Sequence, residues 1–305
     1  MKKRIKKIRN LTIGIVTILF LGNSFRLIKG NKEALKVVSN HQNSNNHEEN
    51  IVAHRGFSGI YPDNSYLAIS KALELPCVDM IEIDVRLTSD KTIVLHHDKN
   101  TSINDLIVSI SKVDLTDIED DLAINDFNLY NLGDINTEDS IFLFSRYLSK
   151  SKYQSYLIRL KNILFLFKDS KTLIIDIKTN KVDYQFMEEL NNLLIGYQGN
   201  IYIQSNCYEF LIYMQEKYPS YKYLFIVNSK NDITKMSSNF DGFTINYKLL
   251  GDIIVDDDKL YFIYTINSKE KYLNVINNEN YHENMYIITD NPDYICGLHD
   301  KLLRK

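Results

Sequence analysis

The strongest constraint on the fold is the regular alternation of short apolar segments, rich in β-branched and aromatic residues, with amphipathic helical segments. Eight apolar segments are predicted strands: residues 51–54, 80–85, 172–177, 201–205, 223–227, 243–246, 260–267 and 285–290. One helical segment is "VDYQFMEELNNLL", in which Val182, Phe186, Leu190, Leu193 and Leu194 share a face. Strands that alternate with helices in this way predict a parallel sheet covered on both faces.

A ninth strand pattern, "TIVLHHD" at 92–98, departs from this alternation. Only six residues separate it from "EIDV", whereas a parallel crossover needs about a dozen or more. We therefore expect an antiparallel hairpin that turns at Ser89, Asp90 and Lys91. Eight parallel strands remain, which is the number that closes a (β/α)8 barrel. The 305 residues, 44% of them apolar, are enough for this α/β fold.

Nearly every predicted strand ends in polar residues, and in barrels of this kind the active site lies at the carboxyl ends of the strands. In chain order these residues are His54 and Arg55; Glu82 and Asp84; Asp176 and Lys178; Gln204 and Ser205; Asn246; Thr265 and Asn267; and Thr289 and Asp290. A barrel that needed only stability would have no reason for such a set.

Glu82 and Asp84 are two residues apart on one strand, so both side chains point to the same face. Carboxylates about 7 Å apart repel each other unless a cation lies between them. A Ca²⁺ or Mg²⁺ ion with oxygen ligands would meet this need, with Asp176 as a third ligand. Lys178 lies on the same face as Asp176 and favours an anion nearby. The alternative is that these acids form structural ion pairs with Arg86 or Lys178.

The hairpin brings a second histidine back toward the first. With a two-residue turn His97 faces Asp84, whereas a shift of one residue presents His96 instead. We favour His97, whose ring Asp98 would orient. His54 and His97 beside an arginine and a metal suit general acid–base attack on a phosphodiester, with the cations offsetting charge on the phosphoryl oxygens.

Taken together, these residues resemble the glycerophosphodiester phosphodiesterase family of the phospholipase C-like phosphodiesterase superfamily. The matching segments, in family order, are "HRG" (54–56), "PDNS" (62–65), "EIDVRLTSD" (82–90), "VLHHD" (94–98), "IDIK" (175–178), "QS" (204–205), "YTIN" (264–267) and "ITDNPD" (288–293). The resemblance covers residues 51 to 295 and implies a barrel with an antiparallel hairpin after its second strand.

The resemblance also implies a role for each matching position. The implied set is His54 and His97 as the acid–base pair, Arg55, Lys178 and Tyr264 as substrate or phosphate ligands, Glu82, Asp84 and Asp176 as ligands of a divalent cation (Ca²⁺ or Mg²⁺), and Asp63, Asn64 and Asp98 as supporting residues. In this family the glycerol hydroxyl attacks its own phosphorus, and water opens the resulting cyclic phosphate. The implied products are glycerol 3-phosphate and an alcohol.

Four positions depart from the family pattern. Asp176 and Asp63 stand where the family usually has Glu, Tyr264 replaces Trp, and Lys91 replaces the Gly of the hairpin turn. Two shortened carboxylates at one site would change the metal preference or weaken activity. Two alternatives therefore stay open: a phospholipase D or C acting on intact lipids, and a protein that binds glycerophosphoryl groups with little turnover.

Residues 99–170 match the family poorly and are predicted to be a variable insertion. From residue 140 to 167 the pattern is helical, with Ile141, Phe144 and Leu148 on one face. We expect a small helical cap over the barrel mouth that selects the substrate.

The first 30 residues contain eight cations and no acid, and an uncharged apolar segment spans 11–22. This pattern predicts a signal peptide or signal anchor, although the segment is short for a bilayer span of about 20 residues. Residues 31–49 read as a polar linker, and 50–305 as the barrel. We expect an exported protein, either anchored in the membrane facing outward or secreted.

Composition excludes one class of partner. Beyond residue 30 the chain has 28 cations and 39 acids (36 − 8 = 28), which opposes binding to nucleic acid. Cys77, Cys207 and Cys296 form no CxxC pair, so we expect three separate buried thiols and no disulfide framework.

Overall fold

The computed structural model describes residues 50–118, 120–124, 146, 150, 152–168, 171–236, 239–282 and 285–303. The predicted signal segment, the linker and the face of Ile141, Phe144 and Leu148 lie outside these residues. Within the described part of the chain, no helix is both long and apolar enough to cross a bilayer.

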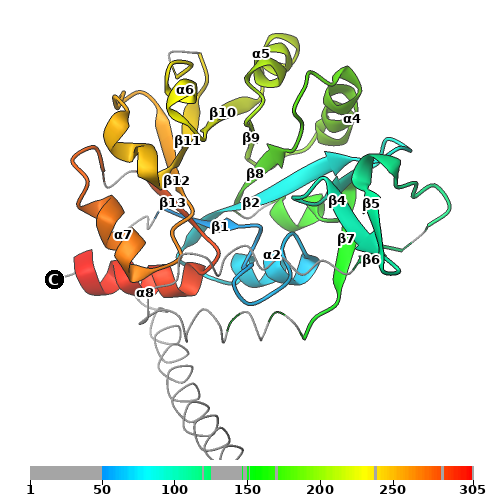
Figure 1. Ribbon diagram of the computed structural model, residues 1–305, viewed down its shortest axis with the longest axis horizontal. Helices are drawn as coiled ribbons and strands as arrows, with labels where there is room; N and C mark the ends of the chain where they lie inside the picture. The colour runs from blue at the N-terminus through cyan, green and yellow to red at the C-terminus, as the bar shows by residue number, and fades with distance from the viewer. Residues whose placement is uncertain are drawn as a thin grey trace, which may run out of the picture.

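Eight parallel strands form a closed barrel (Figure 1). In chain order they are β1 (Ile51–His54), β2 (Val78–Leu87), β8 (Thr172–Ile177), β9 (Ile201–Ser205), β10 (Lys222–Val227), β11 (Gly242–Asn246), β12 (Leu260–Tyr264) and β13 (Tyr286–Thr289). The ring closes because β1 pairs with both β2 and β13. The predicted strand count is confirmed, although β12 ends three residues earlier than expected.

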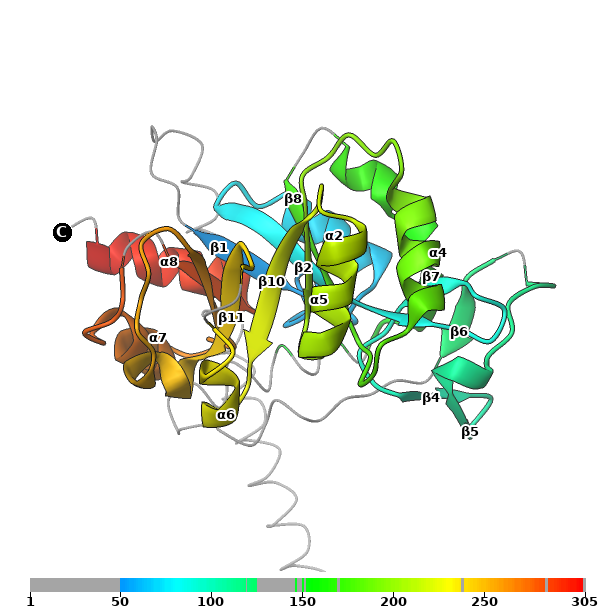
Figure 2. The same cartoon turned by 90° about the horizontal axis from the view of Figure 1, so that it is seen from above.

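Helices and 3-10 turns cover the outside of the barrel (Figures 1 and 2). They are α2 (Tyr66–Leu73), α4 (Tyr184–Leu194), α5 (Tyr208–Lys217), α6 (Lys230–Ile233), η5 (Tyr247–Asp252), α7 (Lys269–Ile276) and α8 (Pro292–Leu303). In α4, Asp183 caps the first turn by accepting from the Phe186 N–H, and Phe186, Leu190 and Leu194 are buried as predicted.

The interior of the barrel has two layers. The lower layer is an apolar cluster of one residue from each of seven strands: Val52, Met80, Ile174, Tyr202, Leu224, Phe262 and Ile288. Side chains alternate along a strand, so the residues two positions further point inward again, nearer the mouth. These are His54, Glu82, Asp176, Gln204, Ile226, Tyr264 and Asp290. The apolar layer, with each side chain contributing about 1.5–3 kcal/mol by burial, therefore supports a polar layer above it.

The hairpin after β2 is present, but its register differs by one residue from the prediction. In β3 (Ile93–Leu95), Leu95 pairs with Val85, and the His96 N–H donates to the Asp84 carbonyl. The turn is a three-residue loop in which Lys91 has a φ of 68°, a conformation that glycine adopts more easily. The prediction of a two-residue turn with His97 opposite Asp84 is therefore wrong.

The insertion is mainly β-structure where it is described, and the helical pattern predicted over 140–167 is wrong at 155–159, which form a strand. It contains β4 (Asn100–Ile103), β5 (Leu106–Ser109), η1 (Ile110–Lys112), β6 (Leu122–Ile124), β7 (Ser155–Arg159), η3 (Leu160–Asn162) and η4 (Leu164–Phe167). β7 pairs antiparallel with β3 and β6. Leu157 packs into a small separate core while Ile158 faces the main one, so tertiary packing overrode the helical spacing.

Two of the three cysteines form a disulfide, contrary to the prediction of separate thiols. Cys77, just before β2, is bonded to Cys296 in α8, 219 residues away, while Cys207 is free and buried. The bond could not be predicted from the spacing of the cysteines. Closure of the barrel brings these two positions together, and closure leaves no local sequence motif.

We expect the Cys77→Ser variant to lose about 2–5 kcal/mol of unfolding free energy, because the bond restricts a very long loop in the unfolded chain. Denaturant titration of the oxidised protein, with Cys207→Ser as the matched control, measures this loss. Equal stability of Cys77→Ser and the unsubstituted protein would contradict the expectation.

Candidate active site

A cavity of about 240 Å³ opens at the carboxyl ends of the barrel strands. Seven of the predicted site residues line it: His54, Arg55, Glu82, His97, Asp176, Lys178 and Tyr264. Asp84 is fully buried next to it, and Asp63, Asn64 and Asp98 contact lining residues or Asp84. The structure thus brings the whole predicted set together.

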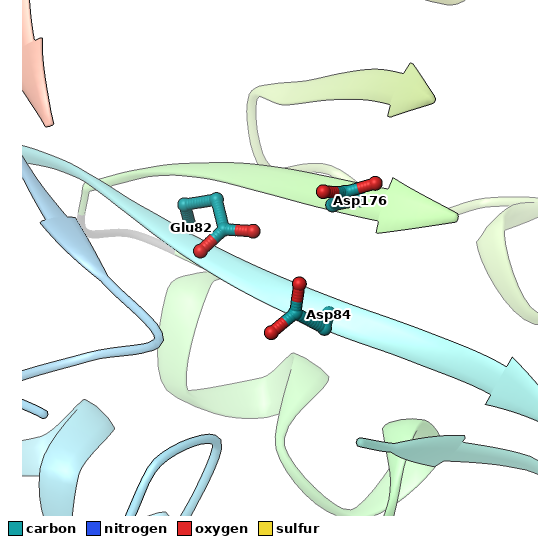
Figure 3. Close-up of side chains that lie close together, drawn as sticks. All are labelled: Glu82, Asp84 and Asp176. Carbon is teal, nitrogen blue, oxygen red and sulfur yellow. The ribbon is translucent and has the colours of Figure 1, made fainter. Parts of the chain in front are cut away.

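Glu82, Asp84 and Asp176 form a buried acidic triad whose nearest ligand oxygens all lie within 4.8 Å of one another (Figure 3). Strand register explains this cluster, because Asp84 on β2 pairs directly with Asp176 on β8. Glu82 is two residues earlier on the same face of β2. The three carboxylates therefore come from adjacent strands of the rigid barrel.

Burial and mutual repulsion shift the pKa values of the three carboxyl groups of the triad. Burial and the neighbouring Asp84 raise the pKa of Glu82 to about 8. Burial also raises the pKa of Asp176. Burial acts the same way on Asp84, but Lys178 and Arg55 outweigh it and hold the pKa of that carboxyl well below its usual range.

Two cations balance part of this negative charge. Lys178 Nζ lies 3.0 Å from Asp84 Oδ1 and 2.6 Å from Asp176 Oδ2, and Arg55 Nε lies 2.9 Å from Asp84 Oδ2. Ion pairs with Lys178, the alternative interpretation, are thus present. Arg86 makes none with the triad, because its guanidinium donates to the backbone carbonyls of His97 and Lys178.

The triad fits a divalent cation despite these ion pairs. Asp176 Oδ1 is buried and has no hydrogen-bond partner among the described residues. Glu82 accepts a backbone N–H from Arg55 at 3.0 Å but has no Lys or Arg side chain bonded to it in the described part of the chain. Two cations facing three carboxylates leave a demand for positive charge, and hard oxygen ligands suit Ca²⁺ or Mg²⁺.

His54, at the end of β1, is held by Asp290, a predicted strand-end residue for which no role in the site was predicted. Its Nδ1 lies 2.6 Å from Asp290 Oδ1, and Asn267 donates to the other oxygen of Asp290. Burial and Arg55 oppose protonation, but Asp290 and Glu82 outweigh them and raise the pKa of His54. The sequence feature that could have predicted this contact is the position of Asp290 at the end of β13, the strand that pairs with β1 in the closed ring.

His97 follows β3 and reaches the same cavity from the hairpin. Its Nδ1 lies 2.7 Å from Asp98 Oδ1, as predicted for the orienting residue. Burial, Arg55 and Lys178 outweigh Asp84 and Asp98 and lower the pKa of His97 to about 4. His96 points elsewhere, with its Nε2 3.2 Å from the Asn100 carbonyl.

The loop after β1 places Arg55 over the triad. Arg55 has a φ of 57°, and a Cβ added to Gly56 would come within 2.8 Å of the α2 backbone, so the "RG" pair permits a close approach that larger residues would block. Arg55 Nη1 lies 3.1 Å from Asp63 Oδ2. Asn64 donates to Asp84 Oδ2 at 2.8 Å and accepts its backbone N–H at 2.9 Å.

The far wall of the cavity carries Tyr264 at the end of β12. Its hydroxyl donates to Asn228 Oδ1, and burial raises the pKa of the phenol. Tyr264 therefore presents an uncharged ring and hydroxyl opposite the charged side of the site.

Known proteins share this sequence pattern and architecture. A model of the glycerophosphoryl diester phosphodiesterase family matches residues 54–251. The protein MG293 of Mycoplasma genitalium is 28% identical over 236 residues, which is 73% of this chain and 88% of that protein. The chain therefore belongs to the glycerophosphoryl diester phosphodiesterase family, and it is an enzyme of the phosphoric diester hydrolase class with an acidic metal-binding triad.

Solved structures agree on the fold. The glycerophosphodiester phosphodiesterase of Thermotoga maritima has a TM-score of 0.55 and 19% identity, and the match covers 83% of this chain and all of that one. A phosphodiesterase of Oleispira antarctica, solved with the product sn-glycerol 3-phosphate, has a TM-score of 0.58 and 17% identity over 82% of this chain and 96% of that one.

We expect Mg²⁺ or Ca²⁺ to raise the melting temperature, because an ion that binds only the folded state adds about 2.7 kcal/mol at 100 times its Kd. Glu82→Gln should abolish this increase, whereas the surface variant Glu188→Gln should keep it. Calorimetric titration checks the same point, and unchanged ion affinity in Glu82→Gln would exclude the triad as the site.

We expect Asp290→Asn to lower the pKa of His54, because the variant removes the negative charge that favours the imidazolium. NMR titration of the His54 ring should show the midpoint at lower pH than in the unsubstituted protein. If His54 acts as a base, the acidic limb of the kcat/KM profile moves the same way and activity falls on the order of 10²-fold. A midpoint that stays in place would show that Asp290 does not control this ring.

Proposed function

We propose that the protein hydrolyses glycerophosphodiesters to glycerol 3-phosphate and an alcohol by paired-histidine acid–base catalysis outside the cytoplasmic membrane. The observation that carries this proposal is the meeting of two carboxylate-oriented imidazoles, His54 and His97, at one cavity with the acidic triad. The product complex of the Oleispira antarctica relative supports the choice of substrate.

His54 suits the general base of the first step. The Asp290 carboxylate accepts the Nδ1–H of His54, so the lone pair on Nε2 faces the cavity. When Nε2 takes the proton of the glycerol hydroxyl, buried Asp290 stabilises the imidazolium that forms. The hydroxyl oxygen then attacks phosphorus and forms the cyclic phosphate.

His97 suits the general acid at the leaving oxygen. Asp98 holds its Nδ1, so Nε2 delivers the proton as the bond from phosphorus to the alcohol breaks. In the free enzyme burial lowers the pKa of His97, and Arg55 and Lys178 lower it further. A bound phosphate anion would offset these two cations. In the second step the roles reverse, and water opens the ring.

The cations of the site hold the phosphate. Arg55 and Lys178 lie on the triad and keep two positive groups within reach of the phosphoryl oxygens. Glu82, Asp84 and Asp176 would hold the divalent ion, which when bound supplies Lewis-acid polarisation of a phosphoryl oxygen. Tyr264, on the opposite wall, would pack against the glycerol.

An extracytoplasmic location has two supports. The cationic start of the chain followed by an apolar segment is typical of export. The Cys77–Cys296 disulfide is a bond that persists in oxidising compartments and is rare in the cytosol. We infer membrane anchoring or secretion through the N-terminal segment.

Purified full-length protein with Mg²⁺ or Ca²⁺ should release glycerol 3-phosphate from glycerophosphocholine. His54→Ala and His97→Ala should each lower kcat by about 10²–10⁴-fold, because each removes a positioned proton carrier, while His41→Ala serves as the control. Choline or inositol release from intact vesicles alone would favour a phospholipase. Calorimetric binding of glycerol 3-phosphate without turnover would favour a binding protein.

A further inference from the structure

A second cavity, of about 530 Å³, lies beside the active site. It is bounded on one side by the insertion, through Lys99, Ser109, Ile110 and Ser111, and on the other by the β8–α4 connection at 178–183. Figure 2 shows β4 and β5 standing near α4 at the same end of the barrel. Lys178 and Asn206 line both cavities, so the two adjoin.

The lining of this second cavity is cationic. Arg86, Lys99 and Lys181 face a single acid among the lining residues, Asp183, while the ammonium of Lys178 is paired with the triad. The Asp183 carboxylate accepts the Phe186 N–H at 3.0 Å as the cap of α4 and keeps its negative charge, but the three cations outnumber it. In the active-site cavity, by contrast, acids offset the cations. The second cavity therefore favours a bound anion.

Arg86 supplies a partly buried donor at the inner end. Its Nε and Nη2 donate to the His97 carbonyl at 3.0 and 2.6 Å, and Nη1 donates to the Lys178 carbonyl at 3.0 Å. A guanidinium has five N–H groups, so these three bonds leave two donors that no bond between described residues uses. The same contacts place this end of the cavity directly behind His97.

Hydroxyl groups complete the lining. Ser109 Oγ and Ser111 Oγ lie 3.1 Å apart on the insertion side. Serine hydroxyls and a guanidinium are the usual neutral and charged donors to phosphate oxygens. Neither Lys99 nor Lys181 is used by the triad, so their charge is available to a ligand.

We propose that this second cavity binds a second phosphate group, carried by the leaving alcohol of the substrate. The inference rests on the proposed function, in which His97 protonates the leaving oxygen on the side of the cavity where Arg86 lies. The bond between phosphorus and the alcohol oxygen breaks, the His97 proton goes to that oxygen, and the second phosphate stays bound without reacting. The preferred substrates would thus be glycerophosphodiesters of phosphorylated alcohols.

The test compares two substrate pairs on full-length protein: glycerophosphoglycerol with and without a terminal phosphate, and glycerophosphoinositol with and without a ring phosphate. We expect kcat/KM to be on the order of tenfold higher for the phosphorylated member, falling with added salt. Lys99→Gln with Lys181→Gln should reduce the preference to about twofold or less, since each exposed ion pair contributes about two- to fivefold. A preference within the first pair would identify the phosphorylated end of a glycerol-phosphate polymer as the ligand. A preference within the second pair would identify a phosphorylated lipid head group.

The control pair, Lys222→Gln with Lys301→Gln, removes the same charge outside this cavity and should keep the preference. Equal kcat/KM for both members of each pair, with turnover intact, would overturn the inference and leave the proposed function standing. Loss of preference in the control pair would assign it to net charge and also overturn the inference. Absence of turnover on all four substrates would end both proposals together.

Discussion

The arrangement of the site depends on one electrostatic constraint: three carboxylates buried at the end of a barrel must be balanced by positive charge. Arg55 and Lys178 supply part of it, at 2.6–3.0 Å from Asp84 and Asp176. A buried carboxylate with no cationic side chain bonded to it holds a proton more tightly, and burial together with Asp84 raises the pKa of Glu82 to about 8. A divalent ion, two fixed cations and an anionic substrate are therefore parts of one charge balance.

The barrel provides the rigidity that such a balance needs. An apolar layer fills the interior below the site, and each polar side chain of the layer above stands two residues beyond an apolar one on the same strand. The spacing between charged groups is thus set by strand register, as in the direct pairing of Asp84 with Asp176. His97 reaches the site from the hairpin after β2, which Arg86 ties to the residue after β8.

Much of this could be predicted from sequence because strand period and strand ends are local features. Alternation placed His54, Glu82, Asp84 and Asp176 correctly without knowledge of the packing. The hairpin register could not be predicted, since a three-residue turn with Lys91 at positive φ has no distinctive residue here. Asp290 was predicted at a strand end, but its role could not be predicted because it depends on the contact of the last strand with the first. The β-structure of the insertion depends on its own small core.

The bond between Cys77 and Cys296 has a consequence for how the molecule comes apart. Helix α8 is covalently joined to the loop before β2. A pulling force on the C-terminus therefore passes through the bond to β2 and cannot unfold the last βα unit alone. Strand β1 and helix α2 precede Cys77 and lie outside this covalent loop, so a force on the N-terminal side can still separate β1 from the ring. The covalent link therefore spans the seam where β13 closes on β1 and β2, the one place in the ring where distant ends of the chain meet.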